Sequence, residues 1–210
     1  MTHAPTESTG YAEIRYLQFN KSRMFRVCER IAGVLTWPLL WPMAMLSRAS
    51  DILFRTFSEM LSVVPYLFGI IGRYEFYRFA LRSVGENVQF EFGVVLIERN
   101  ISIGSNVLIG RYNIIHHCDF GDYVLVGERC TFLSGSRQHS FDRLDVPMAL
   151  QGGLKKRIRI GSDCWIGSHA VIMDDVGSGS IVASGAVVTK PVKPRIIAGG
   201  NPAKTIGRRV

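Results

Sequence analysis

An aliphatic or aromatic residue recurs about every six positions between Val84 and Val188, usually followed by glycine and then, three places on, by a small residue. Ile160-Gly161-Ser162-Asp163-Cys164 and Ile166-Gly167-Ser168-His169-Ala170 are two such hexads in succession. A period of six fits neither an α-helix nor an alternating strand. It predicts short strands joined by tight corners and stacked as a solenoid, with the first residue of each hexad inside a narrow prism. Glycine follows because the backbone turns there without a clashing Cβ.

The phase of this repeat slips by one residue at several places, and we interpret the slips as bulges at corners. From about Leu133 to Arg157 the pattern disappears altogether, and it resumes at Ile158 or Ile160. A coil cannot absorb so many residues, so we expect residues 133–157 to leave the prism as a loop. Long loops on rigid scaffolds commonly carry function.

Residues 1–83 lack the repeat. Met1–Gly10 is polar, and we expect it to be disordered. The segments Ile31–Leu46 and Met60–Ile71 are almost wholly apolar, but both are shorter than a membrane-spanning helix. We predict that Pro38 and Pro42 break the first segment and that Pro65 breaks the second.

Two helices are predicted before the repeat begins. Ser50–Val64 forms an amphipathic helix, and Arg73–Arg82 forms another. The expected apolar side of the first consists of Ile52, Leu53, Phe57, Met60, Leu61 and Val64. Two interpretations stay open: the helices cap the end of the solenoid, or Tyr11–Arg82 lies in a membrane interface.

Composition narrows the classes of function. The 210 residues allow one to two domains, and 47% hydrophobic residues suffice for a core. The net charge of +8 is concentrated at the carboxyl end, where no acidic residue follows Asp175. Such a surface suits a phosphorylated ligand or an anionic membrane; no nucleic-acid-binding module accompanies it, so nucleic acid is not expected as a partner. The four cysteines show no metal or redox spacing, and we interpret them as reduced thiols of a cytoplasmic protein.

Several motifs extend the repeat: Cys164–His169, Val187–Val192, Ala198–Lys204, and, within the loop, Gln138–Asp142 followed by Pro147 and Gln151–Gly153. With them the chain resembles the hexapeptide-repeat acyltransferases. The resemblance implies a left-handed parallel β-helix over residues 84–194, preceded by an α-helical region at 1–83 and followed by a basic tail at 195–210. It also implies acetyl-CoA as acyl donor and a homotrimer with active sites between subunits.

The same resemblance makes His139 the catalytic base. Imidazole suits this role because it ionises near neutral pH. Asp142, Asp145 and Glu128 are available to orient it, and a backbone carbonyl would also serve. His116 and His117 could line the acceptor cleft, but we favour packing or surface roles for them. His169 is interpreted as a structural residue or as one close to the CoA channel.

The resemblance further assigns a donor site and an acceptor contact. The expected CoA-binding residues are Ser168, Ser184, Thr189, Lys190 and Lys204. Gln151 is expected to contact the acceptor or the loop. Gly207 stands where some relatives carry a second cation, so Arg208 or Arg209 would have to replace it. No metal is expected.

We therefore expect a cytoplasmic, acetyl-CoA-dependent O-acetyltransferase acting on a saccharide hydroxyl, with a polysaccharide or lipid-linked sugar precursor as acceptor and a peripheral membrane contact through the first helices. The closest alternative is a xenobiotic (antibiotic) acetyltransferase. A γ-type carbonic anhydrase would need three zinc-binding histidines, and adjacent His116 and His117 cannot supply two from one edge. A non-catalytic β-helix scaffold would need neither His139 nor the basic end.

Overall fold

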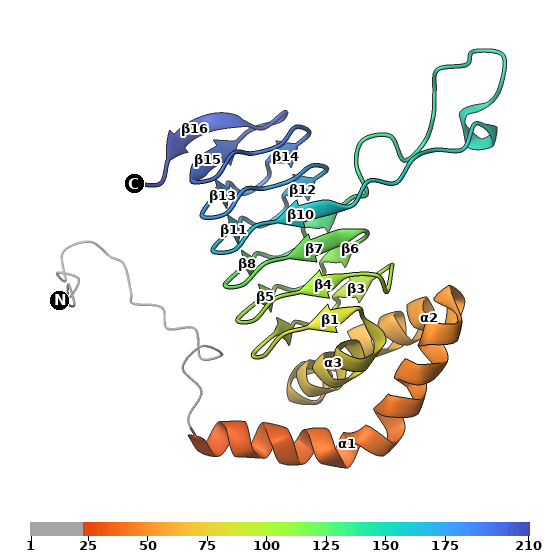
Figure 1. Ribbon diagram of the computed structural model, residues 1–210, viewed down its shortest axis with the longest axis vertical. Coiled ribbons are helices and arrows are strands. Elements are labelled where there is room, and N and C mark those ends of the chain that lie inside the picture. The colour runs from red at the N-terminus through yellow and green to blue at the C-terminus, as the bar shows by residue number, and fades with distance from the viewer. Residues whose placement is uncertain (1–22) are drawn as a thin grey trace.

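The computed structural model describes residues 23–210, so the expected disordered start lies outside the described residues. Three helices, α1 (Arg23–Ala49), α2 (Asp51–Ser62) and α3 (Tyr66–Ala80), lie at one end of a column of short strands (Figure 1). The helices cover this end of the column, and the chain then winds away from them.

The strands form three sheets, which the chain visits in turn. The first sheet holds β1 (Ser83–Val84), β4 (Ser102–Ile103), β7 (Cys118–Phe120) and β10 (Ile158–Ile160). The second holds β2 (Gln89–Phe90), β5 (Leu108–Ile109), β8 (Leu125–Val126), β11 (Trp165–Ile166), β13 (Ile181–Val182), β15 (Ile196–Gly199) and β16 (Lys204–Arg208). The third holds β3 (Val95–Leu96), β6 (Ile114–Ile115), β9 (Thr131–Phe132), β12 (Val171–Ile172) and β14 (Val187–Val188). All pairings are parallel except that of β15 with β16, and the expected β-helix with a helical amino-terminal region is confirmed.

The hexad residues stack inside the prism as the repeat predicts. Ile109 pairs with Val126, Val126 with Ile166, and Ile166 with Val182, and all four side chains are buried. Polar side chains join successive coils at the corners. Asn113, fully buried, donates to the carbonyls of Gly110 and Gly127 and accepts from the Cys130 N–H. This residue is therefore part of the scaffold.

A buried arginine joins the helices to the first coil. Arg73 of α3 donates to the Phe90 carbonyl at 2.9 Å and to the carbonyls of Leu61 and Val64 at 2.8 and 2.9 Å. Helix ends leave carbonyls without intrahelical partners. Arg73 satisfies those at the end of α2 and at the same time fixes α3 on the solenoid.

The predicted break at Pro38 and Pro42 is wrong. Both prolines lie inside α1, which continues to Ala49 and curves (Figure 1). A proline removes one hydrogen bond and displaces one carbonyl, which can bend a helix without ending it. Pro65 does separate two helices, since α2 ends at Ser62 and α3 begins at Tyr66.

The predicted apolar face of the second helix is partly wrong. Ile52 and Met60 are exposed, whereas Phe54 and Ser58 are buried. The Ser58 hydroxyl bonds with the Tyr77 hydroxyl at 2.7 Å and accepts from the Leu96 N–H. A satisfied serine thus occupies the contact face, which a count of apolar residues cannot anticipate.

The expected basic tail, residues 195–210, is built into the solenoid for most of its length. Its β15 continues the second sheet, and β16 folds back along β15. Within residues 23–210, no helix is both long enough and apolar enough to cross a membrane.

Candidate active site

Residues 133–157 leave the solenoid between β9 of the third sheet and β10 of the first (Figure 1). They project beyond the prism and contain one short 3-10 turn, Met148–Leu150. We refer to this segment as the loop.

The two arms of the loop are paired like a short ribbon. The Leu154 N–H donates to the Arg137 carbonyl at 2.8 Å, and the Ser140 N–H donates to the Gly152 carbonyl at 2.9 Å. A Cβ on Gly153 would lie 1.8 Å from the Gln138 carbonyl oxygen. Only glycine allows the arms to come this close. The pairing gives His139, which lies on the first arm between Arg137 and Ser140, a defined position.

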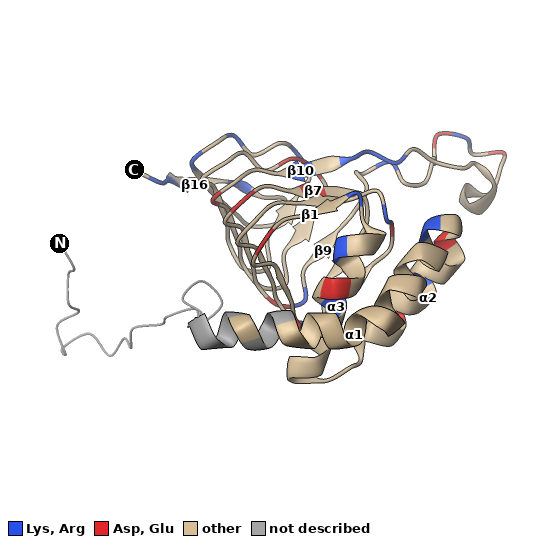
Figure 2. Cartoon of the chain, turned by 60° about the horizontal axis from the view of Figure 1, so that its bottom comes forward, with Lys and Arg blue, Asp and Glu red and all other residues tan. Residues whose placement is uncertain are grey.

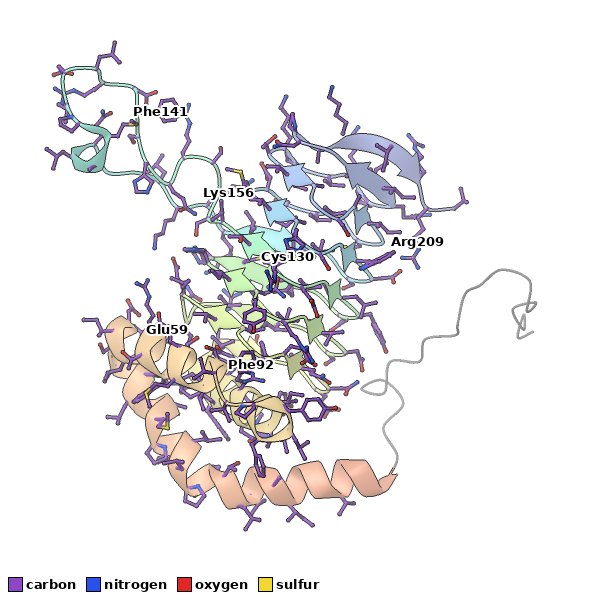
Figure 3. All side chains as sticks on the ribbon, turned by 180° about the vertical axis from the view of Figure 1, so that it is seen from behind. Glu59, Phe92, Cys130, Phe141, Lys156 and Arg209 are labelled. Atoms are coloured by element: carbon purple, nitrogen blue, oxygen red, sulfur yellow. The ribbon has the colours of Figure 1, made fainter. Side chains whose placement is uncertain are left out.

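Ion pairs hold the root of the loop against the prism. Lys155 Nζ lies 2.6 Å from Glu98, Lys156 pairs with Asp174, and Arg157 lies 3.0 Å from Asp119. Figure 3 shows Lys156 at the root and Phe141 farther out along the loop. Sequence reasoning missed these anchoring carboxylates. The available signal was the run of three cations, Lys155, Lys156 and Arg157, at the end of the loop. Adjacent cations next to the prism require acidic partners on it.

His139 is exposed and borders a small hollow together with Arg137, Phe141, Asp142 and Leu154. Of the three acids considered for orienting it, Asp145 is engaged by Arg143, whose hydrogen bond lowers the pKa of the Asp145 carboxyl. Glu128 lies at a different corner of the prism, where its N–H donates to Ser168 Oγ. Asp142 is the remaining acid of the three, and it lines the same hollow as His139.

Gln151 organises the outer part of the loop. Its Nε2 donates to the carbonyls of Arg143 and Val146, each at 2.7 Å, and its Oε1 accepts from the Arg143 N–H at 3.1 Å. Of the two contacts expected for Gln151, the structure shows the one with the loop.

His116 and His117 lie at the root of the loop, between β6 and β7. Burial lowers the pKa of both imidazoles; for His117 the Arg157 guanidinium contributes as well. His117 Nδ1 lies 4.0 Å from a Glu98 oxygen, and its Nε2 is buried without a partner among the described residues. These side chains belong to the anchoring cluster around Glu98.

The expected CoA-binding residues fall on two corners. Ser168 follows β11 and Ser184 follows β13, so both lie at the corner between the second and third sheets. They are on adjacent coils, because the Gly185 N–H donates to the Ser168 carbonyl at 2.9 Å. A Cβ on Gly127, one coil below, would lie 2.6 Å from the Ser168 nitrogen, so the glycine keeps this corner tight.

Thr189 and Lys190 follow β14 and lie at the corner between the third and first sheets, which is the corner that the loop leaves. Lys204 begins β16 and pairs with Gly199 at the end of β15. Both lysines are exposed. Arg209, one of the two candidates for a second cation, is instead paired with Asp163 at 2.8 Å.

In one chain, therefore, the loop with His139 and the column with Ser168 and Ser184 lie at different corners of the prism. In the part of the chain that the structure describes, no group of three His, Cys, Asp or Glu side chains is arranged to bind a metal ion.

Comparisons with known proteins agree with this fold. The family described as bacterial transferase hexapeptide (six repeats) matches residues 157–190. A hexapeptide-repeat-containing acetyltransferase from Vibrio cholerae superposes with a TM-score of 0.62 at 27% identity, covering 75% of this chain and 92% of that one.

Curated relatives point to the same class. A probable macrolide acetyltransferase from Lysinibacillus sphaericus is 33% identical over 120 residues, 46% of this chain and 67% of that protein. The galactoside O-acetyltransferase of Escherichia coli K12 is 34% identical over 136 residues, 59% of this chain and 62% of that protein. The chain belongs to the hexapeptide-repeat acyltransferases. It spans 38% and 25% of the length of two other curated relatives that it matches.

Proposed function

We propose that this protein is an acetyl-CoA-dependent O-acetyltransferase that acts on a hydroxyl of a saccharide, either a polysaccharide or a lipid-linked sugar precursor. The observation that carries the proposal is the exposed His139 on a loop whose arms, root and tip are each held in place. A base positioned this way can meet an acceptor brought from solvent. The similarity to the galactoside O-acetyltransferase supports a saccharide acceptor.

His139 acts as general base in direct transfer. The imidazole takes the proton of the acceptor hydroxyl while the hydroxyl oxygen attacks the thioester carbonyl carbon. The new C–O bond gives a tetrahedral intermediate. The C–S bond then breaks, and the proton passes from the imidazolium to the leaving CoA thiolate. A backbone N–H at the Ser168 corner stabilises the oxyanion, at little cost in reorganisation. Asp142 orients the imidazole.

The donor site is assigned to Ser168, Ser184, Thr189, Lys190 and Lys204. The pantetheine arm runs along the corner of Ser168 and Ser184, where backbone amides pair with it. Lys190 and Lys204 bind the phosphates of CoA. Gln151 affects acceptor binding indirectly, because its hydrogen bonds hold the shape of the loop that the acceptor meets.

A single prism separates the base from the donor column, so the site is completed between neighbouring copies. A homotrimer places the loop of one subunit against the Ser168 corner of the next and repeats this contact three times around an axis. The protein is cytoplasmic, where acetyl-CoA is available, and its first helices make a peripheral contact with the inner membrane.

A xenobiotic acceptor is the second candidate, because a relative is named a macrolide acetyltransferase. The exposed apolar helices favour the saccharide proposal, since a soluble antibiotic would require no membrane contact.

The test is transfer of radiolabelled acetyl groups from acetyl-CoA to a panel of free saccharides, lipid-linked saccharides and antibiotics. The saccharide proposal predicts label in a sugar fraction and its loss with His139→Ala. Label in the antibiotics alone selects the second candidate. If wild type and His139→Ala label every acceptor equally, the proposal is wrong.

A further inference from the structure

Helix α1 is more apolar on its outer side than on the side that faces the protein. The buried side is a narrow stripe of Gly33, Leu40, Ala44 and Ser47, of which three are small. The opposite side presents exposed large apolar residues, with Val34, Leu35 and Leu39 at 72%, 75% and 68% exposure. An ordinary surface helix has the reverse arrangement.

This outward face of α1 comprises Val34, Leu35, Trp37, Leu39, Trp41 and Leu46. At 3.6 residues per turn, these positions together with Val27 and Ile31 cover an arc of about 200° around the helix axis. Figure 2 shows the described part of α1 with almost no charged residue, and Figure 3 shows its side chains projecting away from the solenoid. An apolar surface this wide marks a site of interaction.

Two features indicate a bilayer as the occupant. Ile31–Ser47 contains no charged residue, whereas Arg23, Arg26 and Arg30 precede it and Arg48 follows it. No acidic residue lies between Glu29 and Asp51. Cations at both ends of an apolar helix complement the negative charge of anionic lipid headgroups.

Trp37 and Trp41 occupy the edge of the outward face, next to the buried stripe. Their rings lie 5.6 Å apart. Tryptophan is enriched at the level of lipid headgroups, where its ring is partly in the apolar layer and its N–H meets water. With the helix lying flat, the tryptophans fall at that level and the leucines lie deeper.

A second copy of the chain accounts for the outward face less well. Helix-to-helix packing covers one stripe of each partner, as α1 already shows against α3, and would leave most of the arc in water. A bilayer covers the whole arc at once. Among the described residues, no helix meets the combined length and hydropathy requirements of a membrane span, α1 included.

We propose that the outward face of α1 binds the surface of an anionic lipid bilayer, with the helix lying flat in the interface. Because the helices cover one end of the solenoid, the prism stands on the membrane by that end (Figure 1). This inference specifies the membrane contact of the proposed function but does not depend on catalysis. In Figure 1 the loop of residues 133–157 projects away from the end that carries α1, so the contact concentrates the enzyme at the membrane without laying this loop on the lipid surface.

The experiment is flotation of the full-length protein with vesicles of phosphatidylcholine alone or mixed with phosphatidylglycerol. Wild type is expected to float with the mixed vesicles, and less at high salt. The double variant Val34→Glu/Leu39→Glu is expected to lose most of this binding. The matched control is Leu144→Glu/Leu150→Glu, which places the same two charges on exposed leucines of the loop and should float like wild type. Circular dichroism melting of each variant shows whether it is folded.

A second readout uses tryptophan fluorescence in a Trp165→Phe background, which leaves Trp37 and Trp41 as the reporters. Mixed vesicles should shift the emission to shorter wavelength, and brominated lipid should quench it. The inference is overturned if wild type stays with the soluble fraction at low salt, or if the double variant floats as well as wild type. A double variant that changes the oligomeric mass while wild type ignores vesicles would identify a contact between copies instead. His139→Ala should float normally, which separates failure of this inference from failure of the proposed catalysis.

Discussion

His139 combines two properties that usually conflict, exposure to solvent and a defined position. The backbone pairing of the loop arms and the close approach at Gly153 hold the segment around it, while the imidazole itself stays accessible. A catalytic base needs both properties, because acceptor molecules must reach it from solvent and must meet it in a fixed position. At this scale the proposed chemistry depends on one imidazole and on the side chains that fix its loop.

Replacing His139 by alanine should lower kcat by about 10²–10⁴, because general-base catalysis contributes that much. Affinity for CoA should barely change, as measured by titration calorimetry.

If His139→Ala retained activity within about threefold of wild type, the residue would leave the mechanism. His116 and His117 would then become the candidates. An acetylated enzyme trapped and detected by mass spectrometry would instead overturn direct transfer.

Gln151→Ala should loosen the outer loop, because three hydrogen bonds of its amide are lost. We expect a lower kcat with every acceptor and faster tryptic cleavage after Arg143. Met148→Ala, in the same part of the loop, is the control and should change neither. A rise in the KM of one acceptor, with unchanged proteolysis, would favour direct contact with that acceptor.

At the scale of elements, a carboxylate is buried in the contact between α1 and α3. Glu75 of α3 is buried beside Gly33 of α1 and pairs with Arg78 at 3.3 Å. Burial raises the pKa of the Glu75 carboxyl, and the Arg78 charge opposes this effect only in part. The ionised carboxylate therefore costs the folded state stability.

The sign of the pH dependence follows from the raised pKa. The folded protein holds the Glu75 proton more tightly than the unfolded chain, so stability contributed by this group falls as pH rises above the ordinary glutamate range. Glu75→Gln should melt at a higher temperature than wild type near pH 7, and the difference should shrink toward pH 4. A variant that melts lower than wild type at every pH would show that the carboxylate stabilises α1 against α3.

The next prediction concerns the basic groups at the other end of the solenoid. Replacing Lys190 and Lys204 by alanine should raise the KM for acetyl-CoA more than it lowers kcat, since phosphate contacts far from the reacting carbon bind the ground state and transition state alike. The matched control is Lys193→Ala/Arg195→Ala, which removes two exposed cations at the same end that are not assigned to the donor site. The assignment is wrong if the double variant and wild type show the same preference for CoA over dephospho-CoA thioesters.

At the scale of the whole molecule, the proposed site falls into two halves that lie at different corners of one prism. The corner between the second and third sheets carries Ser168 and Ser184, and the loop leaves the next corner. Closing a ring of copies is the arrangement that joins these halves without distorting either.

Light scattering at micromolar concentration should therefore give a mass about three times that of the 23.5 kDa chain. Detergent below its critical concentration serves as a control for association through the outward face of α1. A monomer under both conditions would end the shared-site proposal.

The sequence by itself determined the solenoid, because a six-residue period leaves each coil one way to bury its apolar residue, as Ile109, Val126 and Ile166 do. It also indicated the extruded loop, since residues 133–157 break that period. Family motifs then drew attention to His139. These inferences depend on local spacing, which a sequence records directly.

Tertiary structure decided what distant residues do to one another. It carried α1 through Pro38 and Pro42, placed Ser58 rather than Ile52 in the contact between α2 and α3, and gave Lys155 its partner Glu98, fifty-seven positions earlier. It also turned the apolar side of α1 outward, away from the protein. Each of these outcomes depends on which surfaces meet in space, and local spacing contains no information about surfaces that lie far apart in the chain.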